Sequence, residues 1–195
     1  MTTPAREPVS RRGVAPRPAL SRAAIIAAGL RIAGSQGLDA VTMRRVAASL
    51  DTSASALYVY VRSREDLADA MFDHVLAPAA DAVIPEGTWR DRLAWLLARS
   101  AQAVSGHGGL AQVAFAKVPG GPNARKLTAR VRELLAEGQT PEQVIPAALD
   151  LLGLLVTAMA LDRVPQQTST PGQRRDRLHW EIEVVLNGLA ASRQP

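Results

Sequence analysis

Hydroxyl, guanidinium and small side chains gather in one stretch of the chain, and their types suit contact with a nucleic acid. Hydroxyls and guanidinium groups bind phosphate oxygens, and four side chains here provide them: Thr42, Arg44, Tyr60 and Arg64. Small side chains at the start of a helix let it enter the major groove, where base edges are read, and a second group suits such a helix: Ala54, Ser55 and Tyr58. Each residue alone has a simpler explanation, such as packing for Tyr58 or a solvated charge for Arg44, so the indication comes from the combination.

Two short helices are expected to position these side chains. Thr42 and Ser53 are suitable N-caps, and Asp51-Thr52 makes a turn between the two helices. Apolar residues recur on one face of each helix and would pack on a core built with a preceding helix: Val46, Ala47 and Leu50 in the first, Leu57 and Val61 in the second, Ile25 and Ile32 in the preceding one. The pattern predicts a helix-turn-helix over residues 42–61.

The charge of the chain is unevenly distributed, and its basic part contains this helix-turn-helix. The 195 residues carry a formal net charge of +5. Residues 1–64 hold ten arginines against three acidic residues, a net charge of +7, whereas residues 65–195 hold 13 basic and 15 acidic residues, a net charge of −2. This asymmetry indicates attraction of the first third to nucleic acid or to an anionic membrane surface.

The rest of the chain reads as helical. From Ser21 onward apolar residues follow helical spacing and period-two alternation is missing, so the sequence predicts an all-α fold of about nine helices. Pro78 and Pro85-Glu86-Gly87 indicate a joint. We expect three parts: a disordered basic tail (1–19), a three-helix helix-turn-helix DNA-binding domain with a linking helix (20–77), and a second helical domain (78–195), to which the resemblance given below assigns ligand binding and dimerisation. The tail is either an inert leader or an arm that reaches DNA.

Several functional classes lack the residues that they require. The chain has no cysteine and only three scattered histidines, which excludes thiolate chemistry and Cys/His zinc spacing. No nucleophile–base pair, carboxylate dyad or phosphate loop is evident, so we expect no enzyme, cofactor or metal; Asp150 and Asp162 are the carboxylates to examine. The longest uncharged apolar stretch, Leu151–Leu161, has 11 residues, too few to cross a membrane, and no secretory signal is visible. A cytoplasmic protein is predicted.

The stretch from Ser21 to Leu76 resembles the DNA-binding domain of tetracycline-repressor (TetR) family regulators. The resemblance rests on three motifs in order: Val41-Thr42-Met43-Arg44-Arg45-Val46-Ala47-Ala48-Ser49-Leu50, Ser55-Ala56-Leu57-Tyr58-Val59-Tyr60-Val61 and Ser63-Arg64-Glu65-Asp66-Leu67. The sequence departs from the family at Asp51, where glycine is usual in the turn, and at Tyr60, where histidine or another polar residue is frequent. Asp tolerates the left-handed conformation better than most residues, so the turn can survive.

The resemblance implies which side chains meet DNA. It places Thr42, Met43 and Arg44 against the DNA, puts Tyr60 and Arg64 near phosphates, and sets Ala54, Ser55 and Tyr58 on the recognition face. If Ala54 and Ser55 lie deepest, direct readout by hydrogen bonds is sparse. Part of the specificity would then come from Arg44, apolar contacts and DNA shape.

The C-terminal part resembles the branch of the tetracycline repressor itself, through Trp89-Arg90-Asp91-Arg92-Leu93, Gly121-Pro122-Asn123-Ala124 and the helix containing Gly153. By sequence order, the positions of that repressor's drug and magnesium ligands fall near residues that bind metal poorly: Ala80, Leu96, Ser100 and Ala114. We therefore expect a small organic effector without a metal. The implied pocket would be mostly apolar, and core packing explains each candidate singly: Trp95, Gln102, His107, Gln112, Phe115, Met159 and Trp180.

The last two predicted helices, an apolar one ending near Asp162 and one over about 173–191, resemble the pair that forms a four-helix dimer interface in the family. A homodimer would present two recognition helices to a pseudo-palindromic operator. The leading hypothesis is a ligand-responsive repressor that a small organic effector releases from double-stranded operator DNA. The alternatives are an activator of the same fold, or a helical small-molecule binding or enzyme domain with a vestigial DNA module.

Overall fold

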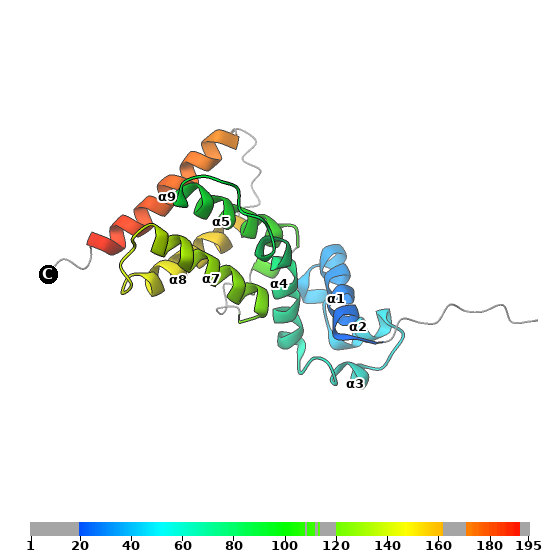
Figure 1. Cartoon of the computed structure of the whole chain (residues 1–195). Coiled ribbons are helices and arrows are strands. Elements are labelled where there is room, and N and C mark those ends of the chain that lie inside the picture. The colour runs from blue at the N-terminus through cyan, green and yellow to red at the C-terminus, as the bar shows by residue number, and fades with distance from the viewer. Residues whose placement is uncertain (1–19, 108, 112, 114–119, 162–170, 192–195) are drawn as a thin grey trace, which may run out of the picture.

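Helices alone form the part of the chain that the computed structural model describes, residues 20–107, 109–111, 113, 120–161 and 171–191. Their order is α1 (Arg22–Gln36), the 3-10 helix η1 (Leu38–Ala40), α2 (Met43–Ser49), α3 (Ala54–Leu57), α4 (Arg64–Ala80), α5 (Trp89–Ser105), α7 (Pro122–Glu137), α8 (Ile145–Leu161) and α9 (Pro171–Ala191). Helices α1 to α3 lie at one end, α5 and α7 to α9 at the other, and α4 joins them (Figure 1). The all-α prediction is confirmed. The sequence also predicts a short helix over about 110–117, and most of that range lies outside the described residues.

Side-chain caps begin five of these helices, including the two predicted above at Thr42 and Ser53. The hydroxyls of Ser21, Thr42, Ser53, Ser63 and Thr88 each accept a hydrogen bond from a backbone N–H in the first turn. Each such cap contributes about 1 kcal/mol to the stability of its helix. At the other end of α1, Gly37 adopts a φ of 83°, which a side chain would strain.

Two helices differ from their predicted extents for local reasons. The sequence Thr140-Pro141-Glu142-Gln143 has the pattern of a capping box with proline at the first helical position, which predicts a helix from Pro141. That prediction is wrong, because residues 142–144 form a turn and α8 begins only at Ile145. Pro146 has no N–H to bond to a carbonyl four residues earlier, so it fits the first turn of a helix but not a second one. Helix α3 ends at Leu57, and residues 58–60 continue as tight turns with hydrogen bonds to carbonyls three residues back.

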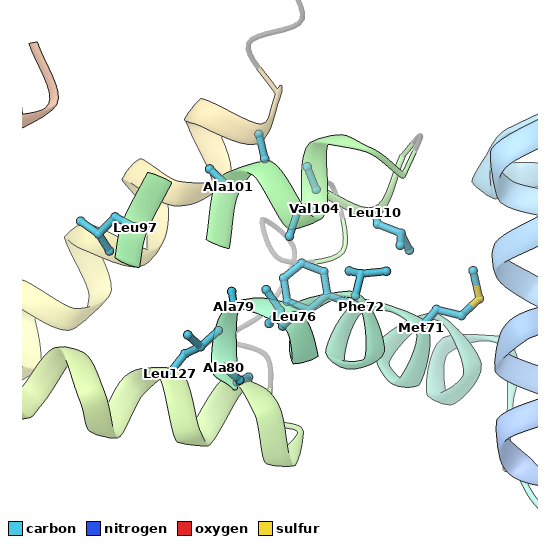
Figure 2. Packing of buried hydrophobic residues seen from close by; sticks show 14 of the residues in the cluster. Met71, Phe72, Leu76, Ala79, Ala80, Leu97, Ala101, Val104, Leu110 and Leu127 are labelled. Carbon is cyan, nitrogen blue, oxygen red and sulfur yellow. The ribbon is translucent and has the colours of Figure 1, made fainter. Parts of the chain in front are cut away.

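Helix α4 runs without a break through Pro78, across the expected domain boundary at residue 77. Its first half packs on α1, so closely that a Cβ on Gly29 would lie 2.6 Å from the sulfur of Met71. Its second half packs on α5 and α7, where Phe72 and Leu76 meet apolar side chains of both helices (Figure 2). A single helix is therefore part of both cores.

Arg130 of α7 holds the C-terminal end of α4. Its guanidinium group donates to the carbonyl oxygens of Ala79, Ala80 and Ala82 at 3.2, 2.9 and 2.8 Å. The last carbonyls of a helix have no partner within it, and a cation there also complements the helix dipole. Among the described residues, no helix combines the length and apolar character needed to cross a membrane.

Candidate nucleic-acid interface and ligand cavity

The outer edge of the helix-turn-helix is lined with exposed polar side chains. Thr42 Oγ1 accepts from the N–H of Arg45 at 3.2 Å and remains exposed, as does Arg44 beside it. At the start of α3, the hydroxyls of Ser53 and Ser55 lie 2.8 Å apart and share a hydrogen bond. Asp51, in the turn between the helices, has a φ of 51°, so the left-handed conformation expected of it is confirmed. Thr42, Arg44 and Ser55 are free to face a ligand, as the sequence predicts.

The most exposed apolar side chains of this end lie just after α3. Tyr58 is 53% exposed and Val59 is 81% exposed, whereas Ala54 is half-buried. An exposed aliphatic group on a recognition element can contact the methyl group of thymine. Sequence reasoning missed Val59, although a signal existed: it lies two residues after the buried Leu57 and so on the opposite face of the helix.

Met43 is the one predicted DNA-facing residue that the structure places in the core, with 8% of its surface exposed. It precedes Val46 and Ala47 by three and four residues, so all three side chains lie on the same face of α2. Tyr60 is half-buried and packs against the same core. Both side chains therefore have little surface left to offer, and their contact with DNA remains a prediction.

Arg64 supports the interface from behind. Its Nε donates to the carbonyl oxygen of Val41 at 2.8 Å, and its Nη2 donates to that of Leu38 at 3.1 Å. These bonds fix the segment that leads into Thr42 and α2. The expectation that Arg64 lies near a phosphate remains a prediction, and the structure gives the residue a positioning role in addition.

Asp66 ties the start of α4 to both neighbouring segments. Its Oδ2 accepts from the N–H of Arg62 at 2.8 Å, and its Oδ1 lies 3.4 Å from Nη2 of Arg22. The backbone hydrogen bond from Arg62 and the nearby Arg22 guanidinium hold the pKa of this carboxyl below its ordinary value. Since the folded state favours the charged form, Asp66 stabilises the fold above its unfolded pKa, and that contribution is lost as pH falls through the lowered value.

We expect acid to weaken the wild type more than the variant Asp66→Asn. As pH falls from about 5 to below about 3, the unfolding free energy of the wild type should decrease more steeply than that of the variant. Urea unfolding followed by circular dichroism at several pH values measures both slopes. Asp39→Asn is the control, because the Asp39 carboxylate is fully exposed. Equal slopes for wild type and Asp66→Asn would contradict this role.

A buried carboxylate links α4 to the start of α7. Asp73 is only 8% exposed, and its Oδ1 accepts from the N–H of Ala124 at 2.9 Å. Asn123 Nδ2 donates both to Asp73 Oδ2 at 3.1 Å and to the Asp73 carbonyl at 3.0 Å. A Cβ on Gly121 would lie 2.1 Å from Asp73 Oδ1, so only glycine fits there. We call this group, Asp73 with Gly121, Asn123 and Ala124, the α4–α7 clamp.

A cavity of about 630 Å³ lies between α4, α5, α7 and α8. Phe72 and Leu76 of α4 form part of its wall, together with Leu97 and Ser100 of α5. Its volume is in the range of sites for drug-sized ligands. Any molecule that fills it touches the same helix that packs on α1.

The side chains predicted to line a pocket do not come together here. Trp95 and Met159 line a separate groove of about 550 Å³ on the other side of α5, and Gln102 lies beside Trp95 in a shallow depression. Trp180 is 65% exposed on α9, and His107 Nδ1 lies 3.1 Å from the carbonyl oxygen of Ala103. Gln112 and Phe115 lie outside the described residues. The prediction favoured polar and aromatic side chains, whereas aliphatic ones from four helices form most of the cavity wall.

The positions expected near a bound drug and magnesium are equally unsuited to metal in the structure. Ala80 and Leu96 are buried, and Ser100 donates its hydroxyl hydrogen to the carbonyl of Leu96 at 2.9 Å. Ala114 lies outside the described residues. Within the described part of the chain, no three His, Asp or Glu side chains gather to hold a metal ion.

In this structure a single helix joins a helix-turn-helix to a helical bundle that contains a cavity. This is the architecture of a transcriptional regulator that binds DNA and a small ligand with the same polypeptide. The family model for bacterial regulatory proteins, tetR family, matches residues 25–71. The HTH-type transcriptional repressor DrrR1 of Streptomyces coeruleorubidus is 29% identical over 184 residues, which are 92% of this chain and 68% of the relative.

Solved structures of other proteins have the same fold as this protein over nearly its whole chain. Apo ActR of Streptomyces coelicolor is 29% identical, with a TM-score of 0.73 over 92% of this chain and 97% of that one. The Streptomyces protein SCO7704 is 30% identical, with a TM-score of 0.68 over 91% of this chain and 97% of that one. The chain belongs to the TetR family of bacterial transcriptional regulators.

Proposed function

We propose that this regulator is a repressor that a small organic effector releases from its operator. The observation that carries the proposal is the double role of α4, which packs on α1 through Met71 and lines the cavity through Phe72 and Leu76. ActR has been solved without ligand and in complex with (S)-DNPA and with actinorhodin, and DrrR1 is named a repressor. Both relatives support the assignment of a ligand-responsive repressor and not of an enzyme. Because its operator would lie on the bacterial chromosome, we propose that the protein acts in the cytoplasm.

The operator-bound form in this proposal is a homodimer through α8 and α9. Large apolar side chains are exposed on both helices: Leu151, Leu154 and Leu161 on α8, Trp180 and Val184 on α9. Burying such a surface against a second copy is favourable, and a two-fold axis would place two recognition elements on one face. The operator is then a pseudo-palindrome read by Ser55, Tyr58 and Val59.

Release of the protein from DNA requires that the effector bind one conformation of the protein more tightly than the other. An effector shifts the protein away from the DNA-binding conformation only if the cavity of the released conformation holds it more tightly. Movement of the α4 half that lines the cavity is transmitted to α1, because Met71 lies against Gly29. The α4–α7 clamp and Arg130 make α7 move together with α4.

Selection from a random double-stranded DNA library tests the proposal with the full-length protein. We expect enrichment of an inverted repeat whose half-sites are centred about 10 base pairs, or a multiple of that, apart. A reporter gene carrying the selected operator should be silenced when the protein is present. Failure to enrich any sequence at moderate salt would refute the DNA-binding function, and a reporter that is switched on would replace repression by activation.

A further inference from the structure

Three hydroxyl groups line the cavity, and each already uses its hydrogen within its own helix. Ser100, Thr128 and Thr157 donate to the carbonyl oxygen four residues earlier, at 2.9, 3.0 and 3.0 Å. A hydroxyl has one hydrogen and two lone pairs, so what these groups present to the cavity is acceptors. The uncharged polar part of the wall therefore favours a ligand that brings donors.

The two charged side chains of the cavity are not equivalent. Arg132 of α7 has its Nη1 3.2 Å from Oε1 of the exposed Glu142, so a carboxylate of the protein already lies beside its charge. Asp150 of α8 lines the same cavity and has no hydrogen-bond or ion-pair partner among the residues that the structure describes. The charge left for a ligand to meet is negative.

Asp150 is exposed to solvent where it lines the cavity, and the wall beside it is apolar. Its neighbours in the cavity wall include Pro146, Leu149 and Leu154, which offer no hydrogen bonds from side chains. A charge interaction next to apolar groups is stronger than in open water. At this side of the cavity an anionic ligand would face a carboxylate and hydroxyl lone pairs, which repel its charge and offer it no donor.

We propose, resting on the function proposed above, that the effector is a hydrophobic cation. Its apolar body packs on Phe72, Leu97 and the other aliphatic walls, its protonated nitrogen pairs with Asp150, and its remaining N–H or O–H groups donate to Ser100 and Thr157. The cavity is large enough for many drug-sized molecules. The Asp150 carboxylate and the hydroxyl acceptors would favour those molecules that carry a positive charge and hydrogen-bond donors.

Two dyes with the same xanthene body separate charge from shape. Rhodamine 6G is a cation and fluorescein is a dianion at neutral pH, and their fluorescence anisotropy reports binding to the full-length protein without DNA. We expect the wild type to bind rhodamine 6G at least about tenfold more tightly than fluorescein, as for one charge-assisted hydrogen bond. Asp150→Asn should lose this preference, and Asp150→Glu should keep it.

Glu133→Gln is the matched control, because Glu133 is exposed on α7 and does not line the cavity. It should bind both dyes as the wild type does, and thermal unfolding shows whether each variant is folded. Equal affinity of the wild type for the two dyes, tighter binding of fluorescein, an unchanged preference in Asp150→Asn, or no binding of either dye up to about 100 μM would each overturn the proposal. Operator selection is independent of all these outcomes, so a failed effector class leaves the repressor function standing.

Discussion

Replacing Asp73 with alanine should lower the free energy of unfolding by about 2–4 kcal/mol. The carboxylate accepts hydrogen bonds from the Ala124 N–H and the Asn123 amide, and it is buried. Removing it leaves the buried Ala124 N–H without its acceptor, while Asn123 keeps only its bond to the Asp73 carbonyl. An unpaired buried group costs more than the bond itself contributes. The shift appears as a lower urea midpoint at a fixed protein concentration, which matters because dimer stability depends on concentration.

Asp81→Ala provides a matched comparison, since Asp81 also joins α4 to α7. Its Oδ1 lies 2.6 Å from Nζ of Lys126, but both side chains are more than half exposed. Exposed ion pairs contribute about 0–1 kcal/mol, so this variant should unfold close to the wild type. If both variants lose the same free energy of unfolding, the burial of the α4–α7 clamp does not make its hydrogen bonds more stabilising than an exposed ion pair.

Tyr58→Ala should weaken operator binding about ten- to a hundredfold at constant salt, and it should relax the preference for the bases that Tyr58 touches. The ring is the largest exposed side chain beside α3, and its removal leaves the buried Leu57 and the fold intact. Fluorescence anisotropy with the selected operator and with operators changed at single positions measures both effects.

Arg44→Ala should act differently from Tyr58→Ala. If its guanidinium meets a phosphate, the loss is nearly the same for all sequences, and the slope of log affinity against log salt falls by about one unit. Arg31→Ala removes an equally exposed arginine from α1, outside the proposed interface, and should change neither quantity. An operator affinity unchanged by Tyr58→Ala and Arg44→Ala would show that another surface contacts DNA.

Features that depend on a few neighbouring residues could be predicted from the sequence. Ser21, Thr42 and Ser53 cap their helices because a hydroxyl meets a free N–H within one turn, and Asp51 takes a positive φ in the tight turn. The buried faces of α2 and α3 follow from helical spacing in the same way. The burial of Met43 follows from the same spacing, because Met43 lies three residues before Val46 on α2.

The cavity could not be predicted, because its walls come from four helices far apart in sequence. Leu97 and Ser100 face it while Trp95, on the same helix, faces away, and only the packing of α5 against its neighbours decides between the two sides. The partner of the Gly121-Pro122-Asn123-Ala124 motif was missed for the same reason. The available signal was an aspartate, Asp73, directly after the two large apolar residues Met71 and Phe72.

The sharing of α4 between two cores determines how this regulator could be recombined with another. Met71 belongs to the core of α1 and Asp73 belongs to the α4–α7 clamp, so the two parts meet within a single turn of one helix. A hybrid joined in the connection between α4 and α5 would carry Phe72, Leu76 and Asp73 into a foreign bundle. A hybrid joined between Met71 and Phe72 keeps each set of contacts with its own partner. Residues 20–71 and 72–191 are thus the units that we propose for exchange.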